Sequence, residues 1–89
     1  MLVLPSELTL TQAQACLRML VQGLPSQTGT AVLVDAGSLQ HFDSSALAVL
    51  LALRRESLTL GKQFVIRGLS PRLADLASLY GVAELLTPA

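Results

Sequence analysis

Apolar residues recur every three or four positions in three segments of the chain, which is the spacing of one face of an α-helix. The first predicted helix is capped by Thr9 and ends near Gly23. The central helix begins at Asp43 or Ser44 and stops at Gly61. Its first two turns are apolar nearly all round, which predicts burial on most sides. The pattern therefore places the most deeply packed helix in the middle of the chain.

The third helix is predicted from Ser70 to Gly81. Ser70 offers a cap, Pro71 occupies the favoured first position, and Gly81 is a natural stop. The predicted inner stripe of this helix consists of Leu73, Leu76, Ala77 and Tyr80. We expect the Tyr80 ring on this inner face, with its hydroxyl at the rim.

Strands are predicted at residues 2–4, 31–34 and 62–68, and residues 82–86 are the candidate for a short edge strand. The run 31–34 is continuously apolar, which is typical of a strand covered on both faces. Strands that alternate with helices pair in parallel through right-handed crossovers. The fold class is therefore α/β, with a small, mostly parallel sheet of about four strands and three or four helices. One domain over residues 1–89 accounts for the whole chain.

Composition limits the function classes. Apolar residues make up 52% of the chain and charged residues 13%, with six basic residues balancing six acidic ones. This balance argues against a nucleic-acid surface, which needs a basic stripe. The longest apolar run, 46–53, is too short to span a bilayer, and residues 1–5 lack the basic start of a signal peptide. We expect a cytoplasmic protein with some apolar surface left exposed for a partner.

Candidate chemistry is sparse. A set of His41, Asp43 and Ser44 consists of near neighbours in sequence, whereas a catalytic triad needs its base held by a second element. The glycines form no phosphate loop, and the metal ligands are too few. The single cysteine, Cys16, excludes an internal disulfide and is expected in the core. We therefore expect no enzymatic activity, no cofactor and no metal.

Two interpretations remain open for residues 42–47, which place a carboxylate and two hydroxyls at the start of the central helix. In the first, Asp43 or Ser44 only caps the helix. In the second, Ser44 is phosphorylated, because the helix dipole favours negative charge there and the added charge would repel a partner. Arg54 and Arg55 follow later in the same helix, where they indicate a solvent-facing turn that a partner's carboxylates could use.

Strand 32–35, the loop after it and the helix start at 42–51 resemble the core of a STAS domain, the family of sulfate transporters and anti-sigma-factor antagonists. Residues 4–9, 64–66 and 69–76 resemble other parts of the same family. In the antagonist branch, the residue after the motif's aspartate is phosphorylated by a partner kinase, and this residue corresponds to Ser44. The resemblance implies a STAS fold, in its anti-sigma-factor-antagonist form, that binds other proteins.

The short N-terminus and leucine-rich central helix resemble a second branch, the cytoplasmic STAS subunit of the Mla phospholipid-trafficking ABC transporter. This resemblance implies docking on the ATPase subunit, support of its assembly and activity, and a location peripheral to the inner membrane. The residues expected at the partner surface are Ser44, Ser45, Asp43, His41, Glu7 and Thr9. The alternative functions are an anti-sigma-factor antagonist switched at Ser44 and a small-ligand or nucleotide-binding module. In the absence of a partner, the chain is also a candidate homodimer.

Overall fold

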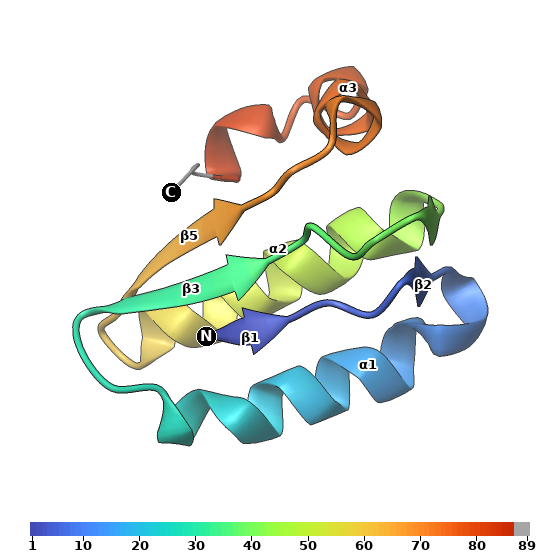
Figure 1. Cartoon of the computed structure of the whole chain (residues 1–89). Coiled ribbons are helices and arrows are strands. Elements are labelled where there is room, and N and C mark those ends of the chain that lie inside the picture. The colour runs from blue at the N-terminus through green and yellow to red at the C-terminus, as the bar shows by residue number, and fades with distance from the viewer. Residues whose placement is uncertain (87–89) are drawn as a thin grey trace.

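A three-stranded parallel sheet forms the centre of the computed structural model, which describes residues 1–86 (Figure 1). Its strands, in the order β1-β3-β5, are β1 (Leu2–Val3), β3 (Ala31–Asp35) and β5 (Gln63–Arg67). Val32 lies opposite Phe64, and Val34 lies opposite Ile66. The predicted α/β class and the parallel pairing are confirmed.

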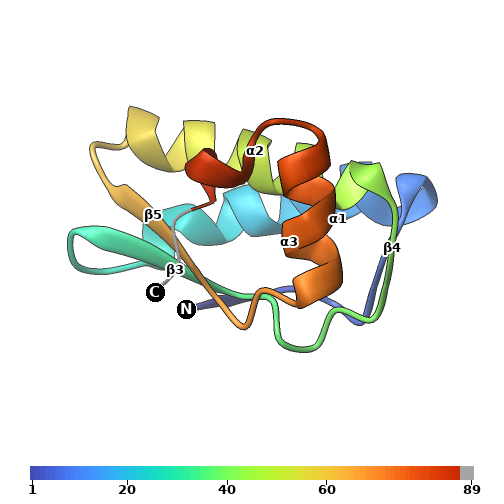
Figure 2. The same cartoon turned by 90° about the horizontal axis from the view of Figure 1, so that it is seen from above.

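Three α-helices accompany the sheet, as predicted: α1 (Leu10–Gly23), α2 (Ser44–Thr59) and α3 (Pro71–Leu79). Figure 2 shows α1 and α2 on the same side of the sheet. This follows from the sequential strand order, because two right-handed crossovers that advance in one direction put both helices on one face. Two short 3₁₀ helices, η1 (Leu24–Ser26) and η2 (Ala83–Leu85), follow α1 and α3. No helix among residues 1–86 is long and apolar enough to span a bilayer.

The two faces of the sheet differ in burial. Val32 and Val34 face the helices and are fully buried, whereas Leu33 between them is only half-buried. Val65 is also half-buried, and Val3 is exposed. The prediction that residues 31–34 are covered on both faces is therefore wrong. The physical reason is that α1 and α2 lie on one face together.

Helix α2 is the most deeply packed element. Its buried residues are Ala46, Leu47, Val49, Leu50, Leu53 and Ser57. The buried Ser57 hydroxyl donates to the Leu53 carbonyl oxygen at 2.8 Å, so this polar group keeps a partner inside the core. Ala48 is exposed in the second turn, and the outer side of the helix is therefore not covered.

The chain after α3 departs from the prediction. Residues 82–86 form η2 rather than an edge strand. Gly81 adopts a positive φ of 72°, and the Val82 N–H then donates to the Ala77 carbonyl oxygen at 2.9 Å. These features turn the chain back along α3, so the main sheet keeps three strands.

Tyr80 also differs from its predicted place on the inner face, because 58% of its surface is exposed. Leu73 and Ala77 of the predicted inner stripe are buried, and Leu76 is half-buried. Tyr80 follows the last residue of α3 and borders a hollow beside α2, which it lines together with Leu47 and Leu51.

A second, two-stranded parallel pair lies at one end of the molecule. It joins β2 (Glu7–Leu8) to β4 (His41–Phe42), with Glu7 opposite His41. Because β2 leads into α1 and β4 leads into α2, this pair brings the beginnings of the two helices together (Figure 1).

Candidate functional site

Asp43 connects the N-termini of α1 and α2. Its Oδ1 accepts a hydrogen bond from the Ser45 N–H at 2.8 Å, which caps α2. Its Oδ2 accepts a second bond from the Leu10 N–H at 3.1 Å, in the first turn of α1. Both helix ends carry partial positive charge, so one carboxylate stabilises two helix starts. The bond from Ser45, followed by that from Leu10, lowers the pKa of Asp43 below its ordinary value.

The N-cap of α1 is part of the same end of the molecule. The Thr9 N–H donates to Gln12 Oε1 at 2.9 Å, and the Gln12 amide donates to Glu7 Oε1 at 3.1 Å. Through the pairing of Glu7 with His41, this network reaches β4, the strand that ends directly before Asp43.

The structure thus brings all six residues of the predicted partner surface to one end of the fold. Glu7, His41, Asp43 and Ser44 are exposed, whereas Thr9 and Ser45 are half-buried. Asp43 and Thr9 form the capping bonds described above. Ser44 stands on the first turn of α2 with its side chain open to solvent, and no hydrogen bond joins it to His41 within residues 1–86.

Ser44 borders a hollow of about 540 Å³ between the start of α2 and α3. Its lining residues are Phe42, Asp43, Ser44, Arg72, Asp75, Leu76, Leu79 and Tyr80. The Arg72 guanidinium lies 5.1 Å from the centre of the Phe42 ring, which is cation–π geometry. Leu79 is 81% exposed and adds apolar surface to this hollow. Sequence reasoning missed the α3 residues, because only the fold places them beside Ser44.

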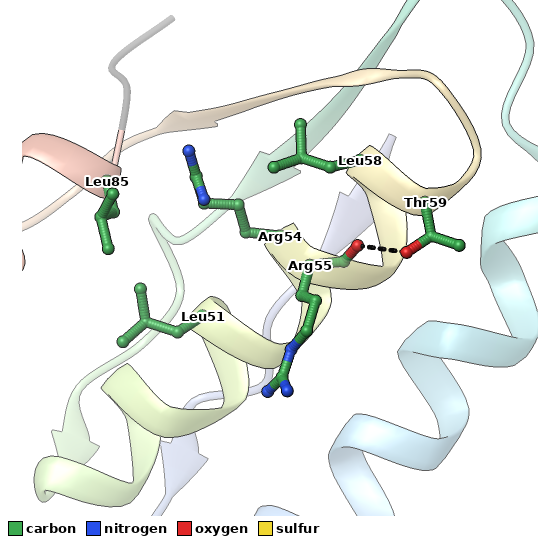
Figure 3. A pocket seen from close by; sticks show the side chains of 6 residues that line it. All are labelled: Leu51, Arg54, Arg55, Leu58, Thr59 and Leu85. Carbon is green, nitrogen blue, oxygen red and sulfur yellow. Dashed lines mark hydrogen bonds between the residues drawn. The ribbon is translucent and has the colours of Figure 1, made fainter.

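The hollow continues along the outer side of α2. A second hollow of about 300 Å³ shares Ser44 and Tyr80 with the first, and a third of about 510 Å³ shares Leu51 with the second (Figure 3). Asp43, just before α2, lines the first hollow. The α2 residues that line the three hollows are Ser44, Leu47, Ala48, Leu51, Arg54, Arg55, Leu58 and Thr59. We call this continuous surface the α2 groove. Its α2 positions recur every three or four residues, so they form one stripe of the helix.

The lining of the groove favours contact with another molecule over metal or small-ligand chemistry. Apolar side chains line most of it, with Ser44 and Arg72 near one end and Arg54 near the other. No cluster of three or more metal-ligating side chains occurs in the described part of the chain. The sequential strand order also gives the main sheet no point where the crossovers change face, which is where open α/β sheets bind small ligands.

Comparison with known proteins supports the fold. A family model described as "Mlab, STAS domain" matches residues 1–87, nearly the whole chain. No curated protein matches the chain. The family match agrees with the parallel α/β architecture. The chain therefore belongs to the STAS domain family, in its Mlab-type group.

Proposed function

We propose that this STAS domain docks on the ATPase subunit of a Mla-type phospholipid-transport ABC transporter and supports its assembly and activity. The family is one of protein-interaction modules that are in general not enzymes, and the name of the matching family points to Mla transport. The observation that carries the proposal is the exposed Ser44 beside an apolar hollow, at the start of the most deeply buried helix. Such docking would hold the chain at the cytoplasmic side of the inner membrane through its complex.

The composition of this hollow suits a protein partner. Interface centres are enriched in aromatic residues and arginine, and Phe42, Arg72 and Tyr80 supply these here. Leu79 adds an apolar side chain that would lose most of its solvent contact on docking.

The surface is also held in place before a partner arrives. Asp43 fixes the starts of α1 and α2 to each other, and the buried side of α2 anchors the helix to the sheet. A partner would therefore bind a pre-formed surface. Because few groups then have to become ordered on binding, the loss of conformational entropy is smaller.

The test is a calorimetric titration with the purified ATPase subunit of the Mla-type transporter from the same organism. Ser44→Arg puts a long charged side chain into the hollow, and we expect it to weaken binding at least tenfold while circular dichroism stays unchanged. Ser26→Arg is the matched control, because Ser26 is also exposed but lies in η1 at the opposite end of α1. Equal affinities of the two variants and the unaltered chain would refute the docking site.

The alternative function, an antagonist of an anti-sigma factor switched by phosphorylation, rests on the same exposed Ser44 hydroxyl at a helix N-terminus. A phosphoryl group there would lie beside Asp43 and Asp75 as well as Arg72. Incubation with a purified anti-sigma-factor serine kinase from the same organism, followed by mass spectrometry of the Ser44 peptide, separates the two functions. Modification of Ser44 with loss of kinase binding would favour the switch.

A further inference from the structure

The far end of the α2 groove differs in chemistry from the end at Ser44. Three leucines, Leu51, Leu58 and Leu85, line this third hollow together with Arg54 and Arg55. Leu58 is 46% exposed and Leu85 is 37% exposed. Figure 3 shows the Arg54 side chain reaching over the hollow between Leu58 and Leu85, while Arg55 leaves the helix on its other side. The hollow therefore combines an apolar floor with positive charge at its rim.

The two arginines have no carboxylate partner in the described residues. The ion pair found among residues 1–86 joins Arg67 Nη2 to Asp35 Oδ2 at 3.5 Å, away from this hollow. The exposed Glu56 follows Arg55 in sequence and the exposed Glu84 precedes Leu85, but neither carboxylate comes within ion-pair distance of Arg54 or Arg55. Among residues 1–86, therefore, no carboxylate occupies either guanidinium group.

We propose that this third hollow binds an acidic, leucine-containing segment of the same ATPase partner, a proposal that rests on the function given above. The apolar side chains of the segment pack on the three leucines, one of its carboxylates meets Arg54 over the hollow, and a second meets Arg55 on the other side of the helix. Arginine suits this role because its planar guanidinium forms paired hydrogen bonds with a carboxylate. Charge complementarity thus selects an acidic segment over a basic one.

The geometry of α2 connects this contact to the Ser44 end. The fourteen residue steps from Ser44 to Leu58 span about 21 Å along the helix axis, at about 1.5 Å per residue. One partner helix of about four turns covers that length. Because neighbouring hollows share Ser44, Tyr80 and Leu51, a single element can lie along the groove without a gap.

The first experiment measures binding of the purified ATPase subunit to the double variant Arg54→Glu, Arg55→Glu. We expect a loss of at least tenfold in affinity, and a much smaller loss for Arg54→Lys, Arg55→Lys, which keeps the charge. The control is Arg18→Glu, a charge reversal at an exposed position of α1, which should leave affinity unchanged. Unchanged affinity of the double variant, with Ser44→Arg still disruptive, would overturn this inference and leave the proposed function standing.

The second experiment does not need the ATPase. A synthetic 14-residue helical peptide with leucine and glutamate on one stripe is titrated into ¹⁵N-labelled protein, beside a twin that carries lysine for glutamate. Amide signals of Leu51, Arg54, Leu58 and Leu85 should shift with the glutamate peptide alone, and the double variant should abolish the response.

Three results of this titration would overturn the inference. They are equal shifts with both peptides, the same shifts with inorganic phosphate alone, and concentration-dependent shifts without peptide, which would indicate a second copy of the chain. If the glutamate peptide binds but the ATPase does not, the charge preference of the hollow is supported and the ATPase is refuted as the partner.

Discussion

The inner and outer sides of α2 contrast sharply in burial although both are rich in apolar residues. On the inner side, Leu50 and Leu53 are fully buried against the sheet and α1. On the outer side, Ser44 and Ala48 are exposed and Leu51 is half-buried in the α2 groove. One helix therefore carries both the core of the fold and the proposed docking surface. Apolar content alone therefore does not distinguish a core position from a contact position, because the fold determines which side of the helix the sheet covers.

The largest expected effect is on the inner side. Leu50→Ala should destabilise the fold by about 2–5 kcal/mol, because it removes buried methyl groups and leaves a cavity. The matched control is Leu79→Ala, the same truncation at a leucine that is 81% exposed, which should change stability by less than about 0.5 kcal/mol. Chemical denaturation measures both. Similar losses for the two variants would contradict the assignment of a core side and a contact side.

A smaller effect is expected at the boundary between the two sides, where Asp43 caps α2 and bonds to Leu10. Asp43→Ala should lower the denaturation midpoint less than Leu50→Ala does, because two backbone N–H groups lose their acceptor but can turn to water. Asp75→Ala is the control, since that exposed carboxylate accepts no hydrogen bond within residues 1–86. If Asp43→Ala were as stable as Asp75→Ala, the hydrogen bonds of Asp43 to the two helix starts would make no net contribution to the free energy of unfolding.

The Asp43 contribution should also depend on pH in a defined direction. Folding lowers the pKa of Asp43, mainly through the bond from Ser45, so the carboxylate stabilises the fold above its unfolded pKa of about 3.9. That stabilisation is lost as the pH falls through the lower, folded-state pKa. The stability gap between the unaltered chain and Asp43→Ala should be constant from pH 7 to about 5 and shrink toward pH 3. A stability difference that widens as the pH falls would contradict the lowered pKa of Asp43 in the folded state.

The predictions from sequence were most accurate where local chemistry determines the structure. The cap at Asp43, the Ser70–Pro71 start and the Gly81 stop each act within one helical turn, and all appear as predicted. The buried Cys16 likewise follows from its place on the apolar stripe of α1.

The errors lie where distant segments meet. Two-residue strands such as β2 and β4 carry no periodic signal, so their pairing and the Asp43 bond to Leu10 could not be predicted. The exposure of Leu33 and of Tyr80 depends on which elements cover them, and that information is not local. For the same reason the sequence indicated Ser44 as a candidate but not the α3 residues that surround it.

The central claim is that Ser44 is open in the free protein and covered in the complex, and thiol labelling tests it directly. The native Cys16 is 7% exposed and burial raises its pKa, so it should react slowly with a maleimide. In Ser44→Cys, the introduced thiol should react as fast as one in an unfolded peptide, and a saturating amount of the ATPase subunit should slow that reaction at least tenfold. Slow labelling of the free variant, or labelling that the bound ATPase leaves unchanged, would contradict the account.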